Sequence, residues 1–431
     1  MKYLRTLILS KQAASWADQI VVSGANLVML LALARWATVA DVGYYAVAFS
    51  LLALAITVQD SLVTRPFTIQ MFKLEVSAET HAAASLALAL LLIAVLSISV
   101  LLVAAGLVIS GASGTVAGLA AMLAAAMPPV LLREFARRYG FALLEPRQAL
   151  ATDLVAAILS MCCVGLLGLS GQLTAITAMA ALAVGCGVSV AGWLICLRRN
   201  FEFDLEASRL NARASIRFGK WLLSGQIALQ AQGYAAHWIT LAIGGAAATG
   251  LYSACLSIVA LSNPFLFGYF NILTPKFVRV LKDHGASALR RQASHDSLII
   301  GAMIGTFVLF VGLLGSQIMD MMFPGEAYRA GIEVLNLLAI ATLLGAIGGP
   351  AGVALMAAER GRPLAVLSAA ICALGSALII LLMWFGGLKA AAVGIVLTEA
   401  LGTLGRWAML FYFIPADQTA TASRSPSSAV T

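Results

Sequence analysis

The chain has 431 residues, of which 61% are hydrophobic and 11% are charged, and its formal net charge at pH 7 is +8. A water-soluble domain usually has about 25% charged residues, so the composition excludes an ordinary soluble protein. A net positive charge can indicate nucleic-acid binding, but here the basic residues recur at regular intervals between apolar segments. This distribution predicts a membrane protein with no nucleic-acid partner.

Segments that are long and apolar enough to cross a bilayer, which takes about 20 residues, follow one another along most of the chain. Six are predicted at 13–36, 42–59, 82–109, 115–132, 148–169 and 174–197, and six more at 215–243, 250–273, 296–317, 331–357, 362–386 and 390–414. Residues 1–12 are short, basic and amphipathic, and we expect an interfacial anchor there rather than a cleaved signal peptide. The sequence therefore predicts an all-α integral membrane fold of about 12 transmembrane helices.

The two sets of spans define two similar halves. We expect an N-lobe at 1–200, a cytoplasmic connector at 201–214, a C-lobe at 215–415 and, because it is rich in Ser, Thr and Ala, a disordered tail at 416–431. With the N-terminus inside, all but three of the 27 Lys and Arg residues lie on the cytoplasmic side. Both termini are thus predicted to be cytoplasmic. Since six spans per half is an even number, the halves are parallel repeats.

Motifs for metal or nucleotide chemistry are missing from the sequence. All six cysteines fall within apolar segments, where cysteine acts as a small hydrophobic residue. The sequence contains no CxxC, HExxH or GxxxxGK[ST] motif. We therefore expect no metal site, no cofactor and no ATP hydrolysis by this chain.

Polar side chains form a stripe on the first predicted helix and another on the seventh. The residues are Asp18, Gln19, Ser23 and Asn26 on the first, and Gln226, Gln230, Tyr234 and His237 on the seventh. A shift of 207 positions superposes Gln19 on Gln226 and Ser23 on Gln230. A carboxylate near the middle of a bilayer costs about 2.5–3.5 kcal/mol, so such groups usually face a partner or a cavity. Either the stripes join helices through hydrogen bonds or, as their matching places favour, they line one water-filled substrate cavity.

Charged residues near the inner ends of the spans have two interpretations. Arg65, Arg133, Arg137 and Arg138 either anchor the topology or form a patch for an anionic diphosphate head group, which suits the bidentate guanidinium. Asp60 could pair with Arg65, and Asp153 could pair with Arg147. Glu399 either pairs with Arg406 or, like Asp18, binds a coupling proton or sodium ion.

Helix-breaking residues fall at matching places in the two halves. Pro128–Pro129 interrupt the fourth predicted span, and Gly348-Gly349-Pro350 interrupts the tenth. Asn263-Pro264 interrupts the eighth. Proline removes a backbone hydrogen bond and kinks a helix, and matching interruptions in two repeats indicate the binding region of a transporter.

Two stretches carry a family resemblance. The pattern D-Q-x-x-x-S-x-x-N at 18–26 is followed by Ala34-Arg35 and by G-x-Y at 43–45, and E-F-A-R-R-x-x-F-A at 134–142 is followed by Ala149-Leu150 and Asp153-Leu154. Together they resemble the polysaccharide flippases of the multidrug/oligosaccharidyl-lipid/polysaccharide (MOP) exporter superfamily. The resemblance implies a V-shaped pair of six-helix lobes that flips or exports a lipid-linked oligosaccharide by alternating access across a bacterial inner membrane. It also implies that the chain is not an enzyme.

Other functions remain open at this stage. A cation-coupled drug or metabolite antiporter of the same fold would be favoured if Asp18 and Glu399 proved to be buried together without a nearby arginine. A membrane glycan polymerase or ligase would need a large outer loop with catalytic residues, and the longest predicted outer segment, 316–330, carries only Asp320, Glu326 and Arg329. A major-facilitator carrier has the same parallel plan but a different loop signature after its second span.

Overall fold

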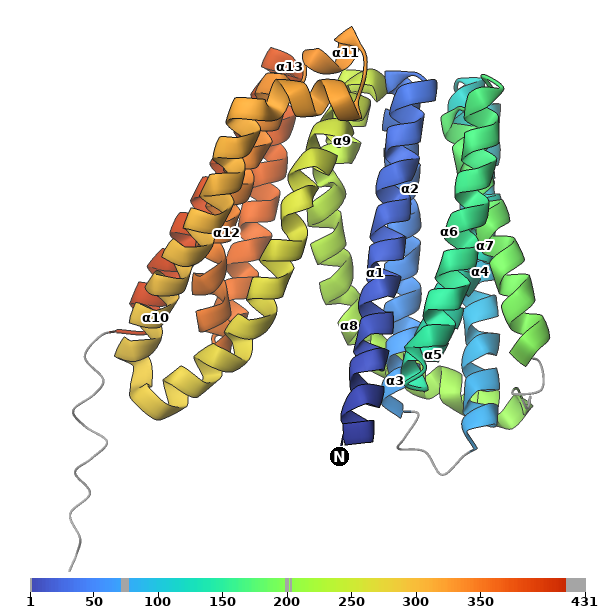
Figure 1. Ribbon diagram of the computed structural model, residues 1–431, viewed down its shortest axis with the longest axis horizontal. Helices are drawn as coiled ribbons and strands as arrows, with labels where there is room; N and C mark the ends of the chain where they lie inside the picture. The colour runs from blue at the N-terminus through green and yellow to red at the C-terminus, as the bar shows by residue number, and fades with distance from the viewer. Residues whose placement is uncertain (1, 71–76, 198–200, 202–203, 416–431) are drawn as a thin grey trace, which may run out of the picture. The chain divides into compact units, whose positions relative to one another are not determined.

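The computed structural model describes residues 2–70, 77–197, 201 and 204–415, and the predicted tail at 416–431 lies outside this range. In the described part of the chain every regular element is a helix (Figure 1). The elements are α1 (Lys2–Trp36), α2 (Val39–Gln59), η1 (Asp60–Thr64), α3 (Arg65–Gln70), α4 (Ala78–Ile109), α5 (Gly114–Ala142), α6 (Pro146–Leu169), α7 (Ala175–Leu197), α8 (Leu205–Ile239), η3 (Thr240–Gly244), α9 (Gly245–Val259), η4 (Ala260–Ser262), α10 (Asn263–Met322), α11 (Glu326–Arg329), α12 (Ile332–Ala357) and α13 (Gly361–Phe413).

Nine helical stretches in the described residues are long and apolar enough to cross a membrane. Two of them, Gly233–Met322 and Gly361–Phe413, are far longer than one span needs. Positive φ values at Gly245 (78°), Gly285 (80°) and Gly387 (66°) break these long stretches, a conformation that glycine adopts without a Cβ penalty. The breaks fall in the segments 244–249, 274–295 and 387–389, which separate predicted spans. The all-helical, multi-pass membrane fold predicted from the sequence is therefore confirmed.

The helices form two compact units. The first contains residues 1–241 and 245–250, and the second contains residues 242–244 and 251–431. By its contacts α8 belongs to the first unit, where it packs on α2, α4 and η1. Residues 205–214, which the sequence assigned to the connector, form the start of this helix. The sequence division follows the repeat rather than the contacts, so the lobe boundaries stay a prediction.

The core of the first unit at the inner ends of the helices is aromatic. Phe67 of α3 is fully buried and stacks on His81 of α4, with 5.3 Å between ring centroids, and on Tyr139 of α5, with 6.2 Å. Trp193 of α7 contacts Tyr139 and Phe135 edge to face. Burial of rings of this size is a large part of a helical core's stability. This aromatic core fixes α3, α4, α5 and α7 relative to one another.

The second unit is built mainly from α10, α12 and α13. One hydrophobic cluster of this unit contains the buried side chains of Leu273, Phe277, Leu289 and Leu410. Pro350 lies inside α12, just as Pro128 and Pro129 lie inside α5, and both helices continue through these residues. Asn263 and Pro264 begin α10 directly after the single 3-10 turn of η4. The predicted interruption of the eighth span is thus a change of helix type.

Gly43 and Gly250 are separated by 207 positions, the shift that relates the two halves, and they meet within the first unit. A Cβ placed on Gly43 of α2 would overlap the carbonyl oxygen of Ala246 and lie 2.7 Å from the amide nitrogen of Gly250. A Cβ placed on Gly250 of α9 would overlap the carbonyl oxygen of Val39 and lie 3.1 Å from the amide nitrogen of Gly43. Small residues permit such backbone contact between membrane helices. We call this contact the glycine crossing.

Candidate functional site

A chain of buried ion pairs forms in the first unit around α5. Arg137 lies between two carboxylates whose side chains are fully buried, Asp18 of α1 and Asp153 of α6. Its Nη2 is 2.9 Å from Oδ2 of Asp18, and its Nε is 3.0 Å from Oδ2 of Asp153. Arg133, one turn earlier on α5, places its Nη1 3.5 Å from Oδ1 of Asp153. Three helices of the first unit are therefore joined by buried charges.

The ion pairs continue from this interior toward the surface. Glu134 contacts Arg133, Arg137 and Arg138, the shortest distance being 3.1 Å from its Oε1 to Nε of Arg138. Arg138 also lies 3.6 Å from Asp60 of η1, which binds Nε of Arg65 at 2.6 Å. The side chains of Arg65 and Arg138 are 41% and 40% exposed, whereas Glu134 is buried. The end of this group with Arg65 and Arg138 is thus accessible, whereas the carboxylates of Asp18 and Asp153 are buried at the other end.

Charges balance within this group, which we call the charge chain. It contains four arginines, Arg65, Arg133, Arg137 and Arg138, and four carboxylates, Asp18, Asp60, Glu134 and Asp153. A buried ion needs a partner because removal from water costs several kcal/mol per ion. Each arginine of the predicted basic patch therefore lies in an ion pair with at least one of these carboxylates. The pairing of Asp60 with Arg65 that the sequence allowed is confirmed, while Asp153 pairs with Arg133 and Arg137 rather than with its expected partner Arg147.

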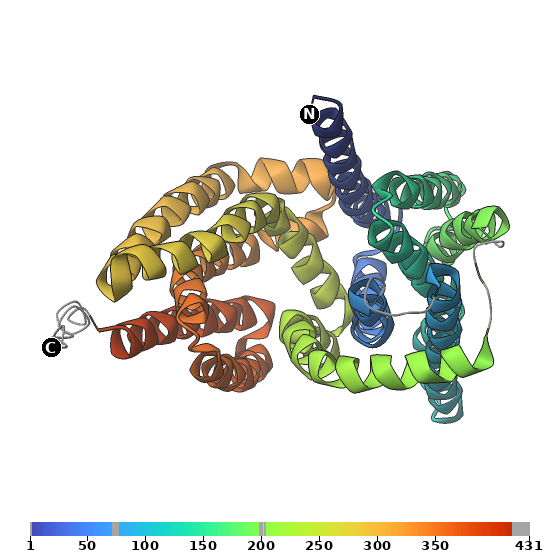
Figure 2. The same ribbon diagram turned by 90° about the horizontal axis from the view of Figure 1, so that it is seen from below.

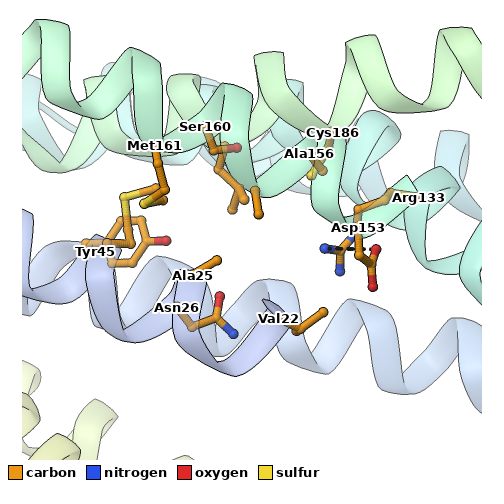
Figure 3. Close-up of a pocket in the computed structure, with 13 residues that line it drawn as sticks. Val22, Ala25, Asn26, Tyr45, Arg133, Asp153, Ala156, Ser160, Met161 and Cys186 are labelled. Carbon is orange, nitrogen blue, oxygen red and sulfur yellow. Dashed lines mark ion pairs between the residues drawn. The ribbon is translucent and has the colours of Figure 1, made fainter. Parts of the chain in front are cut away.

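A small pocket adjoins the charge chain (Figure 3). Its volume is about 30 Å³, and its lining includes Asn26, Tyr45, Arg133, Asp153 and Ser160. Figure 3 shows Arg133 and Asp153 at one end of the pocket, with Tyr45 and Met161 toward the other. A site of this size with several polar groups has room for one or two water molecules.

The polar stripe on α1 is divided between the interior and the surface. Asp18 is fully buried, while Gln19, Ser23 and Asn26 are exposed. Gln19 donates a hydrogen bond to Oγ of Ser23 at 3.1 Å and accepts one from Arg137 at 3.4 Å. Gln19 therefore extends the charge chain to the exposed side of α1, and Asn26 extends the stripe to the small pocket.

The polar stripe on α8 contacts α2. The side-chain amide of Gln230 donates to Oγ1 of Thr57 at 3.1 Å, and Gln226 is half-buried. Tyr234 packs edge to face on His237, which is buried, with 5.8 Å between the rings. Trp238 donates from Nε1 to Oγ of Ser50 at 2.8 Å. The sequence reasoning did not include Thr57, Ser50 or Trp238, although two hydroxyls seven residues apart on an apolar helix were a usable signal.

In the second unit a larger cavity contains one carboxylate. Its volume is about 270 Å³, and its lining is mostly apolar, with Leu266, Phe270 and Leu338 beside Tyr252 and Glu399. Oε2 of Glu399 lies 3.7 Å from Nη2 of Arg406, so the pairing that the sequence allowed is confirmed. Room for both side chains comes from α12. A Cβ on Gly345 would lie 3.0 Å from Glu399, and one on Gly348 would lie 2.8 Å from Arg406.

The sequence reasoning did not include a second carboxylate of this unit, which is fully buried, whereas Glu399 is partly exposed. Asp296 is fully buried on α10 and accepts hydrogen bonds from Tyr269 at 2.9 Å, from Lys276 at 2.8 Å and from Gln292 at 3.1 Å. It stands at the first residue of a predicted span, where an interfacial charge is expected. Hydropathy therefore gave no sign of its burial.

Comparison with known proteins places the fold among solved transporters. No family model matches the sequence, and no curated protein matches it. An inward-facing multidrug resistance MATE family transporter of the MOP superfamily is similar over 94% of this chain and 96% of its own, with a TM-score of 0.74 and 16% identity. A MOP superfamily transporter from Pyrococcus furiosus is similar over 95% of both chains, with a TM-score of 0.62 and 15% identity.

A third solved structure is an outward-facing MATE family transporter of the same superfamily. It is similar over 95% of both chains, with a TM-score of 0.60 and 15% identity. Identities this low establish the fold alone, and all three matches extend over nearly the whole chain. This chain therefore has the fold of the MATE family transporters of the MOP superfamily.

Proposed function

We propose that this chain is a transporter of the bacterial inner membrane that flips or exports a lipid-linked oligosaccharide by alternating access. The fold, shared with MOP superfamily transporters solved in inward-facing and outward-facing conformations, supports a transport role. Three parts of the proposal rest on the sequence resemblance to polysaccharide flippases. They are the saccharide, its anionic diphosphate head group and the bacterial membrane. The charge chain favours a lipid-linked saccharide with an anionic head group, rather than a cation, as the substrate.

The observation that carries the proposal is that both candidate coupling carboxylates have arginine partners. Asp18 lies 2.9 Å from Arg137, and Glu399 lies 3.7 Å from Arg406. A carboxylate that binds a substrate cation or a coupling ion must give up its arginine first. An arginine released from its carboxylate is, in contrast, a strong partner for a diphosphate, because the guanidinium forms two parallel hydrogen bonds with phosphate oxygens.

The charge chain offers a route for such an exchange. Arg65 and Arg138 are the accessible members, and both contact Asp60. A diphosphate that replaced Asp60 as their partner would disturb Glu134 and, through it, Arg137. The saccharide would then meet Gln19, Ser23 and Asn26 on the exposed side of α1, while Gln226, Gln230, Tyr234 and His237 would be its contacts on α8. The lipid tail stays in the bilayer, so only the polar head has to cross about 30 Å of hydrocarbon.

ATP hydrolysis by this chain would not drive the movement, because the sequence has no phosphate-binding loop. A proton or sodium gradient, or consumption of the product on the far side, would drive transport. Asp18 and Glu399 are the carboxylates proposed for ion coupling. Coupling at Asp18 would require Arg137 to shift toward Asp153, 3.0 Å from its Nε.

The experiment that tests the proposal is complementation in a strain that lacks the gene. We expect loss of the surface glycan and accumulation of its lipid-linked precursor on the inner face. Wild-type protein restores the glycan, whereas Arg138→Gln, at the accessible end of the charge chain, restores little. Arg329→Gln, an exposed pair with Asp320 at 2.8 Å, serves as the control and restores it fully. Normal glycan in the deletion strain contradicts the proposal.

A second candidate function is a cation-coupled antiporter for drugs or metabolites. The observation that favours it is the cavity of about 270 Å³ in the second unit, where Glu399 stands among apolar side chains. Lipophilic cations suit a carboxylate beside an aromatic ring such as Phe270. In the same deletion strain this function predicts greater sensitivity to lipophilic cations with unchanged surface glycan.

A further inference from the structure

The first part of α8 differs in direction from the other helices of the first unit. Figures 1 and 2 both show that it runs across the end of the unit at which α1 begins, before α8 turns to follow α2. The chain enters it through Asp204, whose Oδ1 accepts a hydrogen bond from the backbone N–H of Glu206 at 3.0 Å. The candidate span that includes the end of α8 starts only at Gly233. This part of α8 therefore has the direction of a helix that lies in the membrane surface.

Basic residues occupy one face of this segment. Arg209, Arg213, Arg217 and Lys220 are spaced by four, four and three residues, and all four are exposed. At 3.6 residues per turn this spacing keeps them within an arc of about 80°. Glu206 lies on the same face one turn earlier, so the face has four cations and one anion. We call the four cations the basic stripe.

Packing of the opposite face fixes the direction in which the basic stripe points. Asn211, Ser215 and Gly219 are buried and follow one another at intervals of four residues. Asn211 donates from Nδ2 to Oγ of Ser85 on α4 at 3.2 Å. A Cβ on Gly219 would overlap the carbonyl oxygen of Ser61 in η1, so the two backbones are in contact there. The helix cannot rotate about its axis without loss of these contacts.

Large apolar side chains flank the basic stripe. Leu210, which is 59% exposed, and Ile216, which is 48% exposed, lie on its two sides, whereas Phe218, which is 45% exposed, lies about 100° from its edge. Apolar residues this exposed beside a basic face are typical of amphipathic helices that lie at a membrane interface, with apolar groups among the acyl chains and basic groups at the phosphates. The positive-inside distribution places the basic stripe at the cytoplasmic leaflet, which carries the anionic lipids.

We propose that the basic stripe of α8 binds the head groups of anionic phospholipids in the inner leaflet. Charge complementarity, the in-plane direction of the helix and the apolar flank all favour such binding. It does not depend on the identity of the transported molecule. Each Lys or Arg near an anionic membrane surface strengthens binding about fivefold.

The test compares two variants that each remove two exposed positive charges. Arg209→Gln/Arg213→Gln changes the basic stripe, and Arg279→Gln/Lys282→Gln changes exposed residues of α10 in the second unit. The full-length protein is purified in neutral detergent, and its affinity for phosphatidylglycerol, in a background of phosphatidylcholine, is measured by titration and by native mass spectrometry. We expect the α8 variant to bind phosphatidylglycerol about 20- to 30-fold more weakly and the α10 variant to change it by less than about threefold.

Several outcomes would overturn the proposal. Equal weakening in both variants would mean that any cytoplasmic charge attracts the lipid. An unchanged affinity for phosphatidylglycerol in the α8 variant would show that the basic stripe does not bind the lipid. If the wild type bound inorganic pyrophosphate more strongly than phosphatidylglycerol, and the α8 variant lost pyrophosphate binding, the basic stripe would be a site for a diphosphate instead. Arg213→Gln alone, with an expected fivefold effect, provides the same comparison if the double variant does not fold.

Discussion

The two units share a helical plan but bury charge in different ways. In the first unit α5 carries Arg133, Glu134, Arg137 and Arg138, all members of the charge chain. Its counterpart in the second half of the sequence, α12, carries one charged residue, Glu333, in its first turn. In the second unit the Asp296 carboxylate comes instead from α10 and the Glu399 carboxylate from α13, each with a single basic partner.

The two halves therefore repeat a plan of helices without repeating the charged residues on them. The glycine at position 345 of α12 leaves room for Glu399 to reach a cavity, whereas α5 supplies its charges itself. Four arginines and four carboxylates hold one another in the first unit, so removal of one member disturbs several others. In the second unit each ion pair is isolated, so removal of one charged side chain should disturb only its own partner.

The largest effect is expected for Arg137→Gln. The change leaves Asp18 and Asp153 buried without their shared partner, and loss of one member of a buried ion pair costs about 3–5 kcal/mol. We expect a large fall in the unfolding temperature of the purified protein, measured by a fluorescence-based size-exclusion assay. Arg406→Gln is the matched change in the second unit, and its loss should be smaller because Glu399 is 37% exposed.

The double variant Arg137→Gln/Asp18→Asn supplies the control for this prediction. It removes the uncompensated charge of Asp18 and should recover part of the lost stability. Equal losses for Arg137→Gln and Arg406→Gln would break the proposed difference between the two units.

A moderate effect is expected for Asp296→Asn. The neutral amide loses the ion pair with Lys276 and weakens the bonds from Tyr269 and Gln292, which together cost about 1–3 kcal/mol. Lys276 is 38% exposed and can turn to water, so no charge is stranded. Thermal unfolding measures the loss, and Asp283→Asn, exposed and 3.4 Å from Arg279, should leave the unfolding temperature unchanged. A loss as large as that of Arg137→Gln would show that single pairs are as critical as the charge chain.

A smaller effect is expected where α8 meets α2. Trp238→Phe removes the hydrogen bond to Ser50 while it keeps most of the ring, at a cost of about 1 kcal/mol. A double-mutant cycle with Ser50→Ala measures the coupling free energy of the two side chains. Coupling near zero would indicate that the bond does not hold α8 against α2.

The smallest effect is expected for Lys389→Gln. Lys389 and Glu333 pair at 2.6 Å with side chains that are 63% and 65% exposed. Exposed pairs contribute about 0.2–1 kcal/mol and are screened by salt. The unfolding temperature should change little and should change less at high ionic strength. A larger loss than that of Trp238→Phe would show that surface pairs matter more than the buried contacts of α8.

Hydropathy predicted the helices well but misplaced several of their ends. The second span was predicted to stop at residue 59, yet the helix continues through η1 and α3 to Gln70. Asp60 and Arg65 look like the polar end of a span, but their pairing with each other and with Arg138 lets the helix continue. In the same way α10 continues beyond residue 273 to Gly285, and α8 begins ten residues before its predicted span.

The candidate site was only partly predictable from the sequence. Charged residues in apolar helices are conspicuous, so Asp18, Arg137 and Glu399 were identified by type. Their partners were not, because Arg137 and Asp18 are 119 positions apart and nothing local relates them. Pairs within one helix, such as Glu399 with Arg406, follow from helical spacing and were anticipated. The shared substrate cavity of the two polar stripes stays a prediction.

The glycine crossing has a consequence for motion. Where α2 meets α9, a carbonyl oxygen or an amide nitrogen of one helix stands where a methyl group on the other would be. The atoms in this contact belong to uncharged backbone, so separation of the two helices at this point strands no buried charge. A methyl group added at position 43 or 250 would keep the two backbones apart. A transporter with this substitution should therefore work more slowly, because α2 and α9 could no longer come into contact.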